Sequence, residues 1–186
     1  MVWGRKAQVL MSELIIAFVI FTLVLGMVFF LWDMTSMSIL RSEFLHELDS
    51  SSSDAVEKLV RTEGYPADWA SLSLDNISAI GLASNDSRIL DQNKVLRFMD
   101  LMDSGKYDDL CGDITISNYD CSRYLLGLKK YELHFTLTDM DDNSLMLAGL
   151  NCSTGKAPSD PDFLVSVKRS AVLNGDIVKA NLVVWV

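Results

Sequence analysis

The 186-residue sequence has few of the residues on which metal centres and catalytic sites usually depend. Two histidines and three cysteines leave little material for a zinc site or a histidine-based catalytic centre. Basic residues number 16 against 25 acidic ones, and a formal net charge of −9 offers nucleic acid no basic surface. A glycine-rich phosphate loop, a Cys-x-x-Cys pair and a nucleophile elbow are also missing. We therefore expect neither a soluble cytosolic enzyme nor a nucleic-acid-binding protein, and we expect no cofactor.

The sequence does contain one long uncharged stretch. Residues 14–32 read LIIAFVIFTLVLGMVFFLW, nineteen positions without a charge or a proline. A helix of this length spans roughly 28 Å at ~1.5 Å per residue, close to the ~30 Å hydrocarbon core of a bilayer. A buried core helix would normally carry a polar stripe, and Trp32 next to Asp33 is typical of a membrane interface. We therefore predict a transmembrane helix over residues 8–32.

The charges that flank this stretch predict its orientation. Arg5 and Lys6 precede it, residues 1–32 carry a net charge of +1, and the other 154 residues carry −10. The positive-inside rule places the N-terminus in the cytoplasm and residues 33–186 outside the cell membrane. A cleaved secretory signal is not expected, because the apolar run is longer than in such signals and ends in large side chains.

A pattern of basic, small and polar residues stands directly before the apolar run. KAQVLMSEL begins at Lys6 and places a small residue, Gln8 and a polar patch with Glu13 ahead of it. This pattern resembles the class III signal peptide of archaeal type IV pilin-like proteins, which a prepilin peptidase cuts after a Lys/Arg–Gly/Ala pair. The resemblance implies that residues 1–7 are a leader, that cleavage separates Ala7 from Gln8, and that the helix is retained. The alternative is an uncleaved anchor with an ordinary basic flank.

Glu13 is similar to the acidic residue near the start of pilin helices. It would be the sixth residue of the processed chain, whereas the family usually has this residue at the fifth position. A carboxylate at a membrane boundary needs water, a cation or the α-amino group of a neighbouring chain. In pilin-like filaments the neighbouring amine is generally held to set the axial stagger, which implies a role for Glu13 in assembly. A charge at headgroup level with no special role is the alternative.

The helical spacing of apolar residues continues past the membrane segment. We predict that residues 33–63 form an amphipathic stem and that one long helix ends near Thr62, with Gly64 and Pro66 as stop signals. The serine run at 50–53 either bends this helix or forms part of its polar face.

Residues 64–127 are predicted to be a mixed helical and irregular region. One helix should begin after Asp91 and end at Gly105, and a second short helix is expected around residues 107–111 or 122–126.

In residues 128–186 the apolar period changes to two. Asn174-Gly175 between two alternating runs is a strong hairpin signal. We expect strands at residues 131–137, 145–150, 163–173 and 176–186, with a loop over residues 151–162. The predicted fold class is α+β, in which a long N-terminal transmembrane and stem helix packs on a C-terminal antiparallel sheet of about four strands.

Two kinds of modification are plausible outside the membrane. Asn76, Asn85 and Asn151 each begin an Asn-x-Ser acceptor in a segment predicted to be a loop, which suggests a glycoprotein. Cys111 and Cys121 enclose a short loop and are the favoured disulfide, which would leave the third cysteine free.

Cys152 lies inside an acceptor sequence and is therefore expected to be exposed; the alternative disulfide pairs it with one of the other two cysteines. A thiol nucleophile is not expected, because His46 and His134 are weak partners. The acidic run that starts at Asp139 imitates a calcium loop, but Ser144 stands where that loop requires glycine, so an acidic turn and no metal site is the better interpretation.

These features predict a single-pass membrane protein with an extracellular domain and no enzymatic activity. The resemblance implies a structural or minor assembly subunit of a type IV pilus-like filament on an archaeal cell surface. Its partners would be membrane lipid, prepilin peptidase and other pilin-like subunits, bound through the N-terminal helix. The alternative is a membrane-anchored domain that binds an extracellular ligand or protein and does not polymerise. An extracytoplasmic hydrolase is a third class, for which no catalytic constellation is found.

Overall fold

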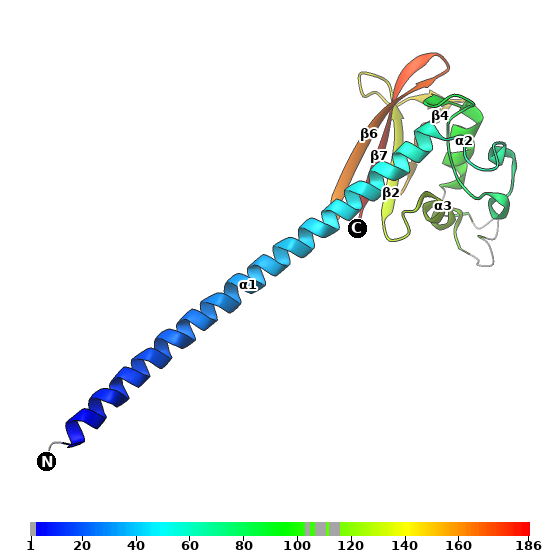
Figure 1. Ribbon diagram of the computed structural model, residues 1–186. Helices are drawn as coiled ribbons and strands as arrows, with labels where there is room; N and C mark the ends of the chain where they lie inside the picture. Colours follow the sequence, from blue (N-terminus) through cyan, green and yellow to red (C-terminus); the bar gives the residue numbers. More distant parts are fainter. Residues whose placement is uncertain (1–2, 103–104, 107–110, 112–115) are drawn as a thin grey trace. The chain divides into compact units, whose positions relative to one another are not determined.

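The structure, a computed structural model, describes residues 3–102, 105–106, 111 and 116–186 (Figure 1). The chain divides into two compact units, Met1–Leu45 and His46–Val186. Helix α1 (Trp3–Arg61) makes up the described part of the first unit and contributes its last turns to the second.

The serine run does not interrupt α1, which confirms the prediction of one long helix ending near Thr62. Ser52 is fully buried, and its hydroxyl donates a hydrogen bond to the Leu48 carbonyl at 2.6 Å. Because this hydroxyl group is hydrogen-bonded within the helix, Ser52 brings no unpaired donor into the core. The side chains that α1 buries in the C-terminal unit recur every three or four residues: Leu48, Ser52, Ala55, Val56, Leu59 and Val60.

Short elements follow α1: the 3-10 helices η1 (Trp69–Ser71) and η2 (Leu74–Asn76), strand β1 (Ile89–Leu90) and helix α2 (Gln92–Leu101). The Asp91 side chain caps α2 as predicted, because its carboxylate accepts from two backbone amides of the first turn. The helix ends at Leu101 and not at Gly105, so the predicted end is wrong by about one turn.

Helix α3 (Asn118–Leu126) covers the second of the two positions at which a short helix was expected. Ser117 caps its N-terminus, and Gly127 ends it in the left-handed conformation at φ 86°. Of the other expected position, 107–111, residues 107–110 lie outside the described residues.

The main sheet has five strands in the order β1-β6-β7-β2-β5, so the expected number of about four is corrected to five. The long strands β2 (Glu132–Thr138), β6 (Leu164–Leu173) and β7 (Asp176–Trp185) lie where the alternation predicts them, and they pair antiparallel. The additional strands are β5 (Ser153–Gly155), inside the expected loop, and β1, which pairs parallel to β6. Strands of two or three residues are too short to show a period of two.

The predicted strand at residues 145–150 is wrong. The chain there forms a small hairpin of β3 (Met146–Leu147) and β4 (Leu150–Asn151) outside the main sheet. Ala148 and Gly149 form its turn with φ values of 49° and 82°. Positive φ at both central residues is the requirement of a type I′ hairpin turn.

One face of the sheet is apolar and lies in the core. Phe135, Leu182 and Val167 are in register across β2, β7 and β6, and all three are buried. The ring of Phe98 from α2 meets that of Phe135 edge-on, with 5.4 Å between the centroids. The last turns of α1, from Leu48 onward, and α2 therefore pack with this face to form the core of the C-terminal unit (Figure 1).

Candidate membrane segment and surface sites

The apolar segment of α1 has no protein surface against which to bury its side chains. In the described part of the chain one helix is long and apolar enough to cross a membrane. The most apolar 18-residue stretch of this helix has a mean hydropathy of 3.1, and none of it is buried against the rest of the protein. The Thr22 hydroxyl donates to the carbonyls of Phe18 and Val19 within the same helix. The one hydroxyl group of residues 14–32 is thus satisfied within the helix, as a hydrocarbon environment requires.

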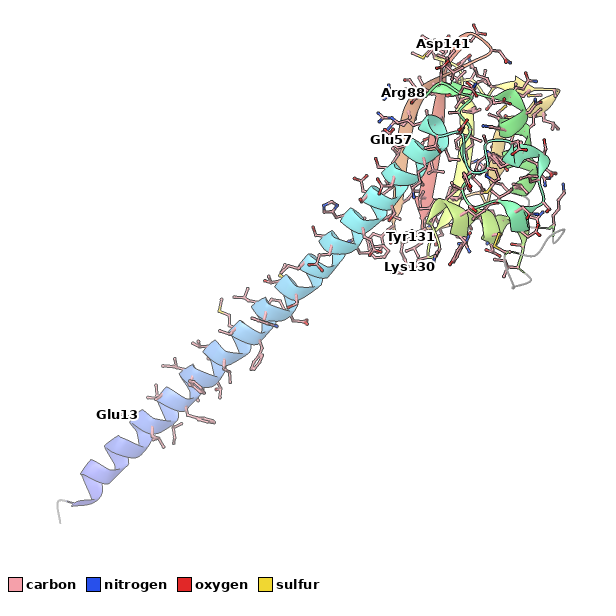
Figure 2. The ribbon with its side chains drawn as sticks, turned by 45° about the vertical axis from the view of Figure 1, so that its right-hand side comes forward. Glu13, Glu57, Arg88, Lys130, Tyr131 and Asp141 are labelled. Carbon is pink, nitrogen blue, oxygen red and sulfur yellow. A yellow bond between two sulfur atoms is a disulfide. The ribbon has the colours of Figure 1, made fainter. Side chains whose placement is uncertain are left out.

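The predicted processing and assembly residues lie on the first turns of α1. Ala7 and Gln8 belong to helical backbone, and their side chains are outside the described ones. Glu13 is exposed at the start of the apolar run (Figure 2).

The end of α1 is capped by a distant loop, which sequence analysis did not find. The backbone amides of Leu82, Ala83 and Arg88 donate to carbonyls of the last turn and the residue after it: those of Leu59, Thr62 and Val60, at 2.7, 3.0 and 3.0 Å. These are carbonyls that a helix leaves without an intrahelical partner. Gly81 allows the close approach, since a Cβ atom there would lie 2.2 Å from the Thr62 carbonyl oxygen.

A buried lysine completes this cap. Lys94 is 7% exposed, and its ammonium group donates to the Glu63 carbonyl at 2.8 Å and the Ala83 carbonyl at 3.0 Å. The cation lies near the C-terminal end of α1, where the helix dipole favours positive charge. Helical spacing is the sequence signal for the burial of Lys94, because it places this residue on the same face of α2 as the buried Phe98 and Leu101.

An ion pair joins α1 to the sheet within the C-terminal unit, and Glu57, its member on α1, is labelled in Figure 2. Arg169 of β6 donates from Nε to Glu57 Oε1 at 2.6 Å and from a terminal nitrogen to the Ser53 hydroxyl at 2.9 Å. The hydrogen bond from Arg169 lowers the pKa of Glu57 below its ordinary value of 4.5, against partial desolvation, and the charge of Arg61 lowers it further. Residues separated by 112 positions make this contact, so no local pattern predicts it.

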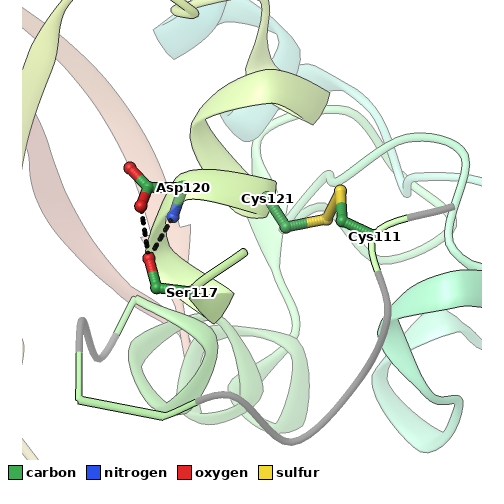
Figure 3. The surroundings of a disulfide bond; sticks show 4 residues. All are labelled: Cys111, Ser117, Asp120 and Cys121. Carbon is green, nitrogen blue, oxygen red and sulfur yellow. Dashed lines mark hydrogen bonds between the residues drawn. A yellow bond between two sulfur atoms is a disulfide. The ribbon is translucent and has the colours of Figure 1, made fainter. Parts of the chain in front are cut away.

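The favoured disulfide is present, with Cys111 and Cys121 joined at a Cα–Cα distance of 5.6 Å (Figure 3). Cys121 belongs to α3, whose first turn is closed by Ser117 and Asp120: the Ser117 hydroxyl accepts from the Asp120 amide and donates to its carboxylate. Tyr119 of the same helix donates to Glu132 of β2 at 2.6 Å. The disulfide therefore joins Cys111 to a helix that is itself anchored on the sheet.

Cys152 is free, as the favoured pairing implies, but its expected exposure is wrong. The side chain is 1% exposed, and burial raises the pKa of its thiol. Its backbone amide donates to Leu145, and its carbonyl accepts from Leu137. These contacts turn the thiol inward although the preceding Asn151 is exposed.

The three acceptor asparagines are all exposed but lie in different kinds of backbone. Asn85 is in a loop as expected, whereas Asn76 ends η2 and Asn151 is in β4. The structure does not bring them together.

The acidic run after β2 is a turn stabilised by its own side chains. Asp139 accepts from the backbone amides of Asp141 and Asn143, and the Asp142 carboxylate pairs with Lys168 and Lys179 at 3.4 and 3.1 Å. Across the described residues, no three His, Cys, Asp or Glu side chains are placed to hold a metal ion.

Ser153 and His134 form an arrangement that resembles part of a catalytic site. The Ser153 hydroxyl is 3.0 Å from His134 Nε2 across β5 and β2. The other ring nitrogen, Nδ1, is buried and has no hydrogen-bond partner in the described part of the chain. A serine–histidine pair used in catalysis needs a group that orients this nitrogen, so the pair is interpreted as a cross-strand contact.

No protein-family model matches the chain, and neither a curated protein nor a solved structure does. Function therefore has to be argued from the residues themselves. The predicted residues that the structure brings into contact are Cys111 and Cys121, whereas Glu13 and the acceptor asparagines are separate features of the surface.

Proposed function

We propose that the protein is a single-pass membrane protein, with residues 33–186 outside the cell. The apolar run of α1, exposed over its whole length, supports the membrane segment. The net charge of +1 before Asp33 and −10 after it supports the orientation. The disulfide Cys111–Cys121 supports it independently, because disulfides persist in oxidising compartments.

Its function in this proposal is that of a structural or minor assembly subunit in a type IV pilus-like surface filament. The observation that carries the proposal is the order of features along α1: a Lys6-Ala7 pair, then Glu13, then an apolar run without a buried side chain. The last turns of α1 pack on a mostly antiparallel sheet, a layout that suits a subunit whose helix assembles with its neighbours. We propose no enzymatic activity, and the protein's partners are lipid, prepilin peptidase and further pilin-like subunits.

The mature N-terminus tests the processing step. Mass spectrometry of the protein from its native membrane should find Gln8 as the first residue. Ala7→Leu should retain residues 1–7, because a large side chain replaces the small residue before the cut. Ala17→Leu, an exposed position of the same helix, is the matched control and should be processed normally. An intact Met1 in the unmodified protein would remove the main support for a pilin-like subunit.

Polymerisation is tested separately by shearing cells and assaying the released filaments. The protein should be recovered in the sheared fraction together with other subunits. Recovery from membranes alone, with a correctly processed N-terminus, would favour the anchored domain that binds a ligand or protein and does not assemble.

A further inference from the structure

The three Asn-x-Ser acceptors differ in how far their side chains are engaged by the fold. We propose that in the folded protein Asn85 is the acceptor for an N-linked oligosaccharide, and that Asn76 and Asn151 are protected from this modification. In the cell the inference rests on the proposed extracellular orientation of residues 33–186, whereas the difference between the three sites is a property of the fold alone.

The transfer reaction sets the structural requirements. The side-chain amide nitrogen of asparagine forms a bond to the anomeric carbon of a sugar carried on a polyprenyl phosphate or diphosphate. The bond between that carbon and the phosphate oxygen breaks, the lipid phosphate leaves with the electron pair, and the transferase takes up the amide proton. An acceptor must therefore present a free amide and a free serine hydroxyl two residues later, on backbone that can enter an active site.

Asn85 meets these requirements. Asn85, Asp86 and Ser87 are all exposed, and within the described parts of the chain neither the asparagine nor the serine side chain makes a hydrogen bond. The loop is closed at its base by Ser84 N, which donates to the Ile89 carbonyl at 2.7 Å. Backbone bonds also hold the Asp86 carbonyl, which accepts from Ile89 N at 3.2 Å, and the Arg88 amide after the acceptor, which donates to the Val60 carbonyl at 3.0 Å. Presenting the Asn85 amide and the Ser87 hydroxyl to an active site therefore breaks no side-chain hydrogen bond or ion pair among the described residues.

Asn76 is held by its own amide. Its Nδ2 donates to the Ser73 hydroxyl at 2.9 Å and to Asp75 Oδ1 at 3.2 Å, so both hydrogens are occupied. The middle residue of the acceptor, Ile77, is 5% exposed, and the Ser78 amide donates to the Tyr65 carbonyl at 2.9 Å. Modification here requires the amide to leave its partners and Ile77 to leave the core.

Asn151 is held by the residues that follow it. Cys152 is 1% exposed, and both its backbone groups are bonded to neighbouring segments at 2.8 Å. The Ser153 hydroxyl, which the transferase must recognise, is already bonded to His134 at 3.0 Å. Presentation of this acceptor would require β4 and β5 to separate from their partners.

The experiment compares the folded chain with unfolded acceptors. The detergent-solubilised full chain, prepared without sugars, is incubated with an oligosaccharyltransferase and a polyprenyl-diphosphate-linked oligosaccharide. Three synthetic peptides of equal length, centred on the three asparagines, are treated in parallel. Site occupancy is measured by mass spectrometry of glycopeptides. The ratio of folded to peptide occupancy removes the intrinsic preference of the enzyme for each local sequence.

We expect this ratio to be at least tenfold higher at Asn85 than at either other site, and Asn85→Gln to abolish modification of the folded chain. Asn76→Gln and Asn151→Gln are matched controls and should leave the Asn85 ratio unchanged. An equal or higher ratio at Asn76 or Asn151, or an unmodified Asn85 in the folded chain, overturns the inference.

A cellular arm separates this inference from the proposed function. Intact cells are labelled with a membrane-impermeant amine reagent, for which Lys130, 74% exposed in its side chain, is a suitable target. Labelling together with a glycan on Asn85 supports both proposals. If the protein is labelled and carries a glycan on Asn76 or Asn151 but not on Asn85, the inference is overturned. If the protein is not labelled, the proposed orientation is overturned, and the ratio of folded to peptide occupancy measured in vitro still decides the inference.

Discussion

Lys94 is a buried charged residue that links the end of α1 to the rest of the C-terminal unit. Its ammonium group is buried and donates to carbonyls from two different segments, one just past α1 and one in the loop that caps it. Charged hydrogen bonds of this kind contribute about 1.5–3 kcal/mol, and their loss leaves a desolvated acceptor behind. The Lys94 ammonium group therefore adds a charged contribution to the three backbone hydrogen bonds of the cap.

We predict that Lys94→Met lowers the free energy of unfolding of the C-terminal unit by about 2–3 kcal/mol, because methionine keeps the volume but donates no hydrogen bond. Cys152 provides the readout, since its thiol is buried in the folded chain and becomes reactive when the chain unfolds. Labelling with a maleimide across a urea series should give a lower midpoint for the variant.

Lys130→Met is the matched control. Its side chain is 74% exposed and lies 3.5 Å from Glu47, a surface ion pair worth at most about 1 kcal/mol. Equal shifts for the two variants would show that the buried contacts of Lys94 contribute nothing beyond an ordinary surface charge.

Residues whose role is local were predictable, and those whose partners are distant were not. Asp91 was identified as a cap because its partners are two and three residues away. Helical spacing places Lys94 on the buried face of α2, but its partner Glu63 lies 31 residues earlier, so no local pattern predicts the hydrogen bonds. The exposure of Cys152 was misjudged for the same reason, because the segments that cover it are not its neighbours in sequence.

At the scale of elements, the ion pair between Glu57 of α1 and Arg169 of β6 makes the contact between helix and sheet dependent on pH. The pKa of Glu57 is lowered in the folded chain, mainly by the hydrogen bond from Arg169. A carboxyl group with a lowered pKa stabilises the folded state above its unfolded pKa, and this contribution is lost as the pH falls through the folded value.

We predict that Glu57→Gln lowers the stability at neutral pH by about 0.5–1 kcal/mol, the range for a partly exposed ion pair. Between pH 5 and 3, roughly, the loss of stability on acidification should become shallower than in the unmodified chain. It should not vanish, because the pKa values of Asp100 and Asp120 are also lowered by their partners and remain in the variant. Urea unfolding followed by tryptophan fluorescence at several pH values measures both effects.

Asp54→Asn controls for the loss of a negative charge on the same helix. Asp54 is exposed and has no ion pair in the described part of the chain, so its substitution should leave the pH profile unchanged. A Glu57→Gln profile that coincides with that of Asp54→Asn would argue against a linkage through Arg169.

Elements with a long repeating pattern were predictable, and short ones were not. The hairpin of β6 and β7 has ten residues on each side and an Asn174-Gly175 turn with φ values of 54° and 93°, so alternation and turn chemistry agree. β1 has two residues and owes its place in the sheet to the loop that caps α1. Its pairing parallel to β6 depends on chain topology, which hydrophobic periodicity does not encode.

For the molecule as a whole, the apolar run of α1 has an acidic residue at each end, Glu13 before it and Asp33 after it. Both are exposed, so their local surroundings do not distinguish them. The proposed function distinguishes these two carboxylates. It pairs Glu13 with the α-amino group of a neighbouring processed subunit, and it leaves Asp33 in water on the outer side of the membrane. A pair of isosteric substitutions at the two ends therefore tests assembly independently of membrane insertion.

We predict that Glu13→Gln reduces recovery in sheared filaments at least tenfold, because the amide cannot neutralise a neighbouring ammonium group near the low-dielectric bilayer. Asp33→Asn should assemble normally, and both variants should reach the membrane and be processed to Gln8 as the unmodified protein is. Quantitative immunoblots of the sheared and membrane fractions measure both recoveries. If Glu13→Gln assembles as well as Asp33→Asn, the carboxylate is an ordinary charge at headgroup level, and the assembly role of α1 has to rest on the packing of its apolar side chains alone.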